Sequence, residues 1–202
     1  ERRVLGGVEL RRLIGAGATG FVFEAWQKDL ARSVAVKILP GAAADPERAV
    51  RFLREARLAA GLRHPGIATV HDCGRIGDSS YLVMEWIEGR SLDKVLADGP
   101  LPIPEAARIA REAALALHAA HRSGVIHRDV KPSNLMVQDD GRVRVLDFGL
   151  ARGREDPGLT RQGTVLGTPH YMSPEQAFSA PHEVDARTDV YSLGAVLYEM
   201  LG

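Results

Sequence analysis

The stretch HRDVKPSN at residues 127–134 brings a carboxylate, an ammonium group and an amide together in one short run. The Asp129 carboxylate can accept, or at least orient, the proton of a substrate hydroxyl. The Lys131 ammonium can neutralise negative charge on a group in transfer. The Asn134 amide oxygen is a hard ligand that suits Mg²⁺. The run therefore predicts a catalytic loop that acts on a hydroxyl and an anionic group.

A further metal ligand is indicated by the tripeptide Asp147-Phe148-Gly149, which follows an expected strand at residues 142–146. A carboxylate at the end of a strand is a natural Mg²⁺ ligand, and glycine permits the backbone turn behind it. This tripeptide is common in turns, but here it stands 13 residues after Asn134, behind a hairpin with Asp140-Gly141 at its tip. That position makes the prediction specific.

A glycine-rich run, GAGATGFV at residues 15–22, fits the pattern G-x-G-x-x-G-x-V. Glycines allow the backbone N–H groups to approach phosphate oxygens closely. A dinucleotide-binding fold would continue into a helix, but a strand-like alternation follows here. The G-x-x-x-x-G-K-[ST] pattern of P-loop NTPases is absent from the sequence. A hairpin that covers phosphates fits better.

A lysine in an apolar strand, Lys37 in VAVK at residues 34–37, is the next candidate. An edge-strand lysine is the ordinary interpretation. If the side chain points inward it needs an anionic partner, because an unpaired buried charge is very costly. The following helix offers Glu55 as that partner.

The pattern of apolar residues predicts two regions of different character. The first has strands at 8–14, 21–26, 33–39, 67–70 and 81–86, and one helix that begins at Pro46, is capped by Asp45 and ends at Gly61. We expect its apolar face to include Val50, Leu53 and Leu58. The second region has a long helix from Pro104 to about His121, short strands within 125–149, and a helix from near Asp185. The apolar face of the long helix is predicted to hold Ile109, Ala113, Leu117 and Ala120. That of the last helix is predicted to hold Val190, Leu193, Val196, Leu197 and Met200.

The composition is that of an ordinary globular protein, with 45% hydrophobic and 26% charged residues. The 26 acidic and 26 basic residues balance, so no global charge attracts nucleic acid or an anionic membrane, and phosphate binding must be local. The single cysteine, Cys73, excludes an internal disulfide framework and a thiolate zinc site, and it suits a reducing cytosol. No apolar run is long enough to span a membrane and no signal-peptide pattern is present, although a membrane segment beyond residue 202 stays open.

The substrate class is indicated by the stretch GTPHYMSPE at residues 167–175, which looks like the peptide-docking loop of protein kinases, with Ser173 in place of the more familiar alanine. Small-molecule kinases of the aminoglycoside and choline type share an H-x-D-x-x-x-x-N loop but lack this segment. Lys131 and Thr168 together form the serine/threonine pattern. From Leu5 to Gly202 the chain therefore resembles the catalytic domain of bacterial Hanks-type protein serine/threonine kinases.

The resemblance implies an α+β, two-lobe protein-kinase fold. Residues 1–87 would form the N-lobe, a small antiparallel sheet with one main helix and the hinge at its end. Residues 88–202 would form a mostly helical C-lobe, incomplete here after its F helix. Later C-lobe helices, and the arginine that normally pairs with Glu175, would lie beyond residue 202. Asp189 matches the helix aspartate that fixes the catalytic-loop backbone in this family.

The resemblance also implies the reaction, transfer of the ATP γ-phosphoryl group to serine and threonine hydroxyls of proteins, with ATP and Mg²⁺ as cofactors and Mn²⁺ as a substitute. Asp129 and Lys131 would be catalytic, and Asn134 and Asp147 would hold the metal. Lys37 would contact the α- and β-phosphates, with Glu55 holding it in place. The remaining ATP-binding residues would be Gly15, Gly17, Gly20, Ile14, Val22, Ala35, Met84 as gatekeeper, Glu85, Trp86 and Met136. Val22, Ala35 and Met136 can equally be plain core residues. His127 and Phe148 are expected to pack on Ala59 and Val70 rather than to act as base or ligand.

Regulation by phosphorylation is implied by Arg128, which directly precedes Asp129. Arg51 and Arg152 would join it in a pocket for a phosphothreonine on the activation loop. Thr160 is the main candidate for autophosphorylation and Thr164 the second, while Thr168 would serve substrate docking. A surface threonine without a role is the ordinary alternative for Thr160.

Protein substrates are the implied partners, with self-association for autophosphorylation in trans, no nucleic acid, no membrane within this segment, and a cytoplasmic location. Two other interpretations stay open. A pseudokinase or interaction module would bind partners without catalysis, although Lys37, Asp129 and Asp147, which pseudokinases usually lose, are all present. A fragment that holds every catalytic residue could also be too incomplete to fold alone.

Overall fold

The computed structural model describes residues 4–5, 7–17, 20–148, 169–178 and 184–202. The chain divides into two compact units. The first comprises residues 1–61 and 69–86, and the second comprises 62–68 and 87–202. The division falls one residue before the expected lobe boundary, and residues 62–68 belong to the second unit although the sequence analysis assigned them to the first.

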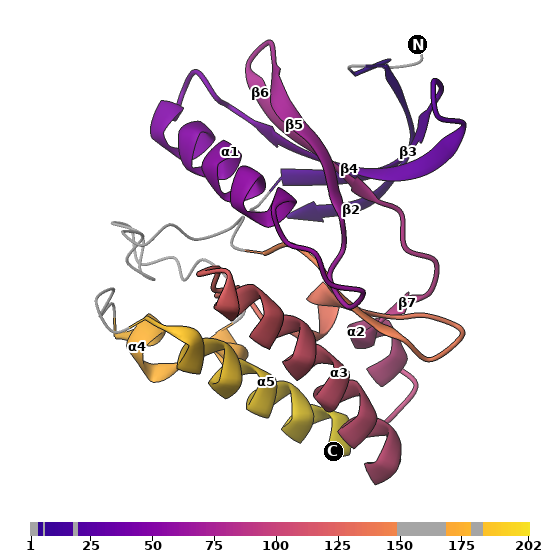
Figure 1. Ribbon diagram of the computed structural model, residues 1–202, viewed down its shortest axis with the longest axis vertical. Coiled ribbons are helices and arrows are strands. Elements are labelled where there is room, and N and C mark those ends of the chain that lie inside the picture. Colours follow the sequence, from indigo (N-terminus) through magenta and orange to yellow (C-terminus); the bar gives the residue numbers. More distant parts are fainter. Residues whose placement is uncertain (1–3, 6, 18–19, 149–168, 179–183) are drawn as a thin grey trace. The chain divides into compact units, whose positions relative to one another are not determined.

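The first unit is a six-stranded antiparallel sheet with one helix against it (Figure 1). The strand order is β1-β2-β3-β4-β6-β5. Its strands are β1 (Val4–Leu5), β2 (Val8–Gly17), β3 (Gly20–Gln27), β4 (Arg32–Pro40), β5 (Val70–Ile76) and β6 (Ser79–Glu85). Helix α1 (Pro46–Ala60) packs on β5 and β6. All neighbouring strands run antiparallel, so short hairpins suffice to connect most of them.

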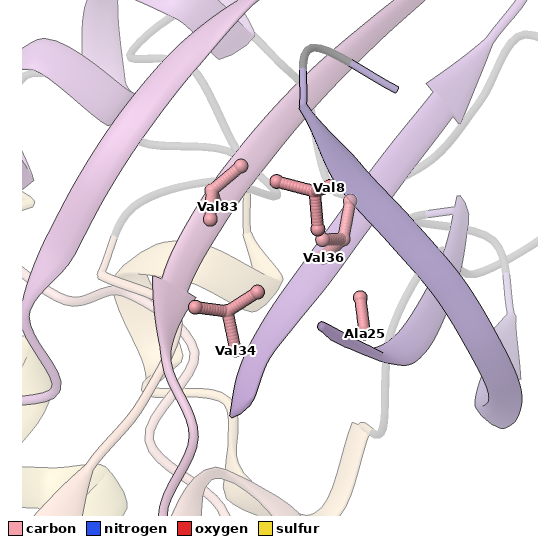
Figure 2. Close-up of a cluster of buried hydrophobic side chains, with 5 residues drawn as sticks. All are labelled: Val8, Ala25, Val34, Val36 and Val83. Atoms are coloured by element: carbon pink, nitrogen blue, oxygen red, sulfur yellow. The ribbon is translucent and has the colours of Figure 1, made fainter. Parts of the chain in front are cut away.

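A buried hydrophobic cluster of this sheet lies on one face of the central strand β4. Figure 2 shows the cluster Val8, Ala25, Val34, Val36 and Val83, all of them buried. Because side chains alternate along a strand, Ala35 and Lys37 point to the opposite face from Val34 and Val36. The second face of β4 therefore carries the candidate site residues Ala35 and Lys37.

Helix α1 begins as predicted, with Asp45 accepting a hydrogen bond from the Arg48 amide at 2.9 Å and Pro46 at its first position. Of the three residues predicted for its buried face, Leu53 is buried as expected, but Val50 is 61% exposed and Leu58 is 52% exposed. The buried residues are Ala49, Phe52, Leu53, Ala56 and Ala59. The three alanines let the helix lie close to the sheet, and Phe52 and Leu53 are the large side chains buried with them.

The expected strand at 67–70 also differs from the structure. Ile67 forms an isolated parallel bridge with Val145, while β5 starts at Val70. The Ala68 amide donates to the Val145 carbonyl at 3.0 Å, and the Val145 amide donates to the Gly66 carbonyl at 2.8 Å. These bonds tie residues 62–68 to the second unit.

The second unit is mostly helical. It contains β7 (Arg90–Ser91), α2 (Leu92–Leu96), α3 (Ile103–Arg122), the 3₁₀ turn η1 (Pro132–Asn134), β8 (Leu135–Val137), β9 (Val143–Val145), η2 (Pro169–Tyr171), α4 (Pro174–Ala177) and α5 (Ala186–Leu201). The strands form a small antiparallel sheet in the order β7-β8-β9. Helices α3 and α5 pack side by side (Figure 1).

The two long helices have different buried faces. The four apolar residues predicted for α3 are all buried, as expected. On α5, Val190 is exposed, contrary to the prediction, and the buried residues are Thr188, Asp189, Ser192, Val196 and Met200. The first half of this face is polar because it receives hydrogen-bonding groups of neighbouring loops. Among the described residues, no helix is both long and apolar enough to cross a membrane.

Candidate active site

The predicted catalytic loop, residues 127–134, folds so that its three functional side chains meet. The Lys131 Nζ lies 2.7 Å from the Asp129 Oδ2. The Asn134 Nδ2 donates to the same oxygen at 3.2 Å and to the Asp129 carbonyl at 2.8 Å. Pro132 opens the 3₁₀ turn that brings Asn134 back toward Asp129. Among the contacts of the described residues, Oδ1 is the Asp129 carboxylate oxygen left to accept a proton.

The metal-ligand candidates Asn134 and Asp147 come from neighbouring elements. The Leu146 amide donates to the Asn134 carbonyl at 2.9 Å, which aligns the end of β9 with the start of β8. Both Asn134 N–H bonds described above use Nδ2, so the amide oxygen is the atom available to a cation. Asp147 has φ of 57°, an uncommon value for a residue other than glycine and one that clusters at functional sites.

The donor set suits Mg²⁺ without a protein cage. No group of three or more His, Cys, Asp or Glu in the described part of the chain could hold a metal ion by itself. One carboxylate and one amide oxygen are nevertheless the kind of partial shell that Mg²⁺ completes with substrate phosphates and water. The residues therefore fit a metal that arrives with a nucleotide.

The backbone of the catalytic loop is held by Asp189 of α5, which is 0% exposed. Its Oδ2 accepts from the His127 amide at 2.8 Å and its Oδ1 from the Arg128 amide, also at 2.8 Å. Oδ2 also lies 2.6 Å from the Nε2 of His121 on α3. The carboxylate thus joins α3, α5 and the loop, in agreement with the role expected for Asp189.

His127 is a packing residue in this geometry. The ring is fully buried, with its Nε2 2.7 Å from the Leu146 carbonyl and its Nδ1 accepting from the Asp129 amide at 3.2 Å. Its centroid lies 4.7 Å from that of Phe148. Both nitrogens are used by the backbone, so the ring is not placed to act as a base.

In the first unit the register of the sheet gathers four ATP-binding candidates on one face. Directly opposite residues of an antiparallel pair point to the same side. Val22 lies opposite Lys37, and Ala35 lies opposite Met84. Lys37 is only 2% exposed, so its ammonium group requires compensation. Glu55 is half-buried on α1, and neither Lys37 nor Glu55 is without an interaction partner.

The three glycines of the glycine-rich run differ in what they permit. Gly20 has φ of 107°, and a Cβ there would collide with the Ile38 carbonyl, so this position requires glycine for the hairpin itself. A Cβ on Gly15 would make only ordinary contact with Val22. A Cβ on Gly17 would meet no described atom within 4 Å. Packing among the described residues therefore does not require glycine at position 17.

The other nucleotide candidates have the following places. Ile14 is exposed on β2, Glu85 ends β6 with its Oε2 accepting from the Thr69 amide at 3.1 Å, and Trp86 follows it. Met136 is half-buried in β8 of the second unit, opposite Ser91 and Arg144. Arg51 is half-buried on α1 and Arg128 lies in the catalytic loop. Gly149, Arg152, Thr160, Thr164 and Thr168 lie outside the described residues.

The predicted docking loop is described from Pro169, and we call residues 169–176 the docking segment. It is anchored on α5 by three hydrogen bonds. The Tyr171 hydroxyl donates to Glu199 at 2.5 Å, Ser192 donates to the Tyr171 carbonyl at 2.7 Å, and Thr188 donates to Glu175 at 2.5 Å. Thr188 is thus a partner for Glu175 that the sequence analysis did not anticipate.

Electrostatics support this anchoring. Burial, and then the hydrogen bond and charge of Glu199, raise the pKa of the Tyr171 hydroxyl far above its ordinary value, which keeps it a donor. Burial opposes ionisation of Glu175, but hydrogen bonds from Thr188, from its own backbone and from Ser173 outweigh this and hold its pKa below the ordinary value. The docking segment therefore offers a neutral phenol and a carboxylate to α5 at neutral pH.

Sequence reasoning missed two residues of the site. One is His121, which contacts Asp189. The other is Gln176 of α4, whose Nε2 donates to the Arg128 carbonyl at 2.8 Å. No spacing rule pointed to either, because each contact joins residues far apart in the chain.

Comparison with known proteins places this geometry in a family. The protein kinase domain family matches residues 8–202. The chain is 46% identical over 200 residues to the serine/threonine-protein kinase PknB of Mycobacterium leprae, with 96% of this chain and 32% of that protein covered. It is 43% identical over 201 residues to PknA of Mycobacterium tuberculosis, covering 96% of this chain and 46% of that protein. The chain thus spans a third to a half of the length of these curated relatives.

Solved structures give the same result. The crystal structure of the PknI kinase domain of Mycobacterium tuberculosis superposes with a TM-score of 0.79 at 32% identity, covering 98% of this chain and 75% of that one. The apo form of PpkA-294 superposes with a TM-score of 0.84 at 25% identity. The kinase fold expected from the sequence is confirmed.

Proposed function

Because the chain belongs to the protein kinase family, we propose that it transfers the γ-phosphoryl group of ATP to serine and threonine hydroxyls of proteins. The observation that carries this proposal is the Asp129 carboxylate, held by Lys131 and Asn134 on a loop whose backbone is fixed by the buried Asp189. Relatives named serine/threonine-protein kinases support the hydroxyl specificity.

The chemistry follows from the charges in the loop. Asp129 orients a substrate hydroxyl and accepts its proton through Oδ1, while Oδ2 stays with Lys131 and Asn134. The Lys131 ammonium balances negative charge as it develops on the group in transfer. Asn134 and Asp147 would hold Mg²⁺, with Mn²⁺ as a substitute, and the metal supplies charge neutralisation on the phosphates.

Nucleotide binding is proposed for the first unit. Lys37 would pair with the α- and β-phosphates and Glu55 would keep it in place. The glycine-rich hairpin, with Gly15, Gly17 and Gly20, would cover the phosphates. Val22, Ala35 and Met84, which share the face of Lys37, would contact adenine together with Ile14, Glu85 and Trp86. Met136, in the second unit, stays a separate candidate for an adenine contact. Protein substrates, self-association for autophosphorylation in trans, and a cytoplasmic location complete the proposal.

The test is transfer of label from γ-labelled ATP to a generic protein substrate, followed by acid hydrolysis and phosphoamino acid analysis. We expect label on serine and threonine and none on tyrosine. EDTA should abolish the transfer and added Mg²⁺ should restore it, because the described residues offer only a partial shell from which a chelator can remove the metal. Label confined to tyrosine would reject the proposed serine/threonine specificity. Nucleotide binding without any transfer would reject the proposed activity and favour an interaction module.

Regulation is proposed to depend on autophosphorylation of Thr160, with Thr164 as a second site and Arg51, Arg128 and Arg152 as the residues that bind the phosphate. Mapping the phosphopeptides of the active protein should find Thr160 modified, and Thr160→Ala should lower kcat several-fold. Thr164→Ala is the matched comparison and should have the smaller effect. Thr160 found unmodified in fully active protein would exclude it as the activating site.

A further inference from the structure

Arg128 has an unusual backbone that the structure must stabilise. Its φ is 65°, in the left-handed region that residues other than glycine rarely occupy. A conformation of this kind is strained and persists only where the surroundings enforce it. Arg128 directly precedes the catalytic Asp129, so whatever enforces its backbone also places the carboxylate.

Two buried side chains share this task, one on each side of the residue. Asp189 accepts from the Arg128 amide, and Gln176 donates from Nε2 to the Arg128 carbonyl at 2.8 Å. The peptide unit between Arg128 and Asp129 is therefore held at both polar groups, because the Asp129 amide donates to the His127 ring. Without Gln176 the carbonyl end of this unit would lose its donor.

The orientation of the Gln176 amide is itself fixed. Gln176 is 9% exposed, and its Oε1 accepts from the amide of Ser173 at 3.2 Å and from its hydroxyl at 3.4 Å. An amide flip would set Nε2 against the Ser173 amide and Oε1 against the Arg128 carbonyl, breaking its bonds at both ends. One side chain thus connects the docking segment to the catalytic loop through a defined chain of hydrogen bonds.

We propose that Gln176 is a positioning residue that fixes the Arg128–Asp129 peptide and so couples the docking segment to the catalytic carboxylate. This inference rests on the proposed kinase function. It extends that function by assigning to the docking segment a part in ordering the base as well as in holding the substrate. Gln176 does not touch the reacting atoms, so its effect must appear in turnover rather than in nucleotide affinity.

The first variant is Gln176→Met, which has similar length and no donor. We expect kcat to fall roughly tenfold to a hundredfold, as misplacement of a catalytic group by about 1 Å does. The KM for ATP should stay within about twofold, because nucleotide binding is assigned to other residues. Gln27→Met, on β3 of the first unit, is the matched control and should leave kcat unchanged. The midpoint of thermal unfolding is measured for both variants.

The second variant, Gln176→Glu, tests the bond itself. A carboxylate cannot donate to the Arg128 carbonyl, whereas a protonated carboxyl can. Burial raises the pKa of a carboxyl, so this variant should be partly protonated in mildly acidic buffer. The ratio of its kcat to that of the parent protein should rise as the pH is lowered from about 8 to about 6. A residue that only packs would give a flat ratio.

The outcomes separate this inference from the proposed function. Unchanged kcat in Gln176→Met, with an active parent protein, would overturn the inference alone. A fall in kcat of Gln176→Met that comes with an equal loss of ATP affinity and a lowered unfolding midpoint would also overturn the inference, because it indicates a merely structural role. A flat pH dependence of the kcat ratio for Gln176→Glu would overturn it as well. A parent protein that transfers no label would overturn the proposed function and this inference with it.

Discussion

Replacing Asp129 by Asn will lower kcat by about 10²- to 10⁴-fold, the usual contribution of a positioned general base. The substitution keeps the size of the side chain, so the loop should still fold around Lys131 and Asn134. It removes the negative charge and the capacity to accept a proton. The new side-chain amide must also face the Lys131 Nζ and the Asn134 Nδ2, which in the parent protein both donate to the Asp129 Oδ2. The loss should therefore fall on turnover.

The measurement is steady-state transfer of label from ATP to protein, with the KM for ATP determined in the same experiment. We expect this KM to change little, because nucleotide binding is proposed for other residues. Asp139→Asn is the matched control, an exposed aspartate of the same unit that the site does not use, and it should retain parental kcat. Transfer that persists at the parental rate in Asp129→Asn would remove Asp129 from the mechanism.

The catalytic loop could be predicted from the sequence because its geometry is local. Asp129, Lys131 and Asn134 lie within one tight turn, and Pro132 restricts the backbone between them. Their close spacing puts the three side chains within reach of one another, while Asp189 and Gln176 hold the loop backbone from a distance. The same holds for the start of α1, where Asp45 and Pro46 define the first turn without help from distant residues.

The face of a helix was harder to predict than its position. On α1 the large aliphatic residues Val50 and Leu58 suggested a face that is in fact exposed. Phe52, Leu53 and the neighbouring alanines are buried instead, so only Leu53 of the predicted face was correct. Periodicity does not distinguish these neighbouring faces when each carries apolar residues. On α5 the buried Asp189 and Thr188 could not be told from solvent-facing polar residues by periodicity. Burial of a polar group depends on partners that periodicity does not reveal.

Long-range hydrogen bonds mark the limit of the sequence argument. The bond from Gln176 to Arg128 and the contact between His121 and Asp189 each join elements that only the tertiary fold brings together. Glutamine has no characteristic spacing that would signal such a bond. Both contacts support the backbone of the catalytic loop. Gln176 and His121, which were not predicted, therefore help to hold the loop that the sequence predicted most clearly.

Replacing Asp189 by Ala should destabilise the protein by about 3–5 kcal/mol. The carboxylate is fully buried and accepts from the amides of His127 and Arg128 and contacts His121. Each buried donor left without an acceptor costs about 1–3 kcal/mol. A loss of this size is a large part of the ordinary stability of about 5–15 kcal/mol, so we expect a clear fall in the unfolding midpoint. Urea denaturation gives the free energy, and kcat should fall as well because the loop loses the acceptor for its His127 and Arg128 amides.

Two comparisons distinguish this explanation from a general effect of the substitution. Asp185→Ala removes the N-cap of the same helix, where the carboxylate accepts from the Arg187 amide, and should cost only about 1 kcal/mol. Equal losses for the two aspartates would show that helix capping, not the buried anchor, carries the effect.

In a double-mutant cycle, His121→Ala and Asp189→Ala should show a coupling free energy of about 0.5–3 kcal/mol, as residues in direct contact do. A coupling near zero would mean that the 2.6 Å contact contributes nothing to the anchor, leaving the two loop amides as its whole basis.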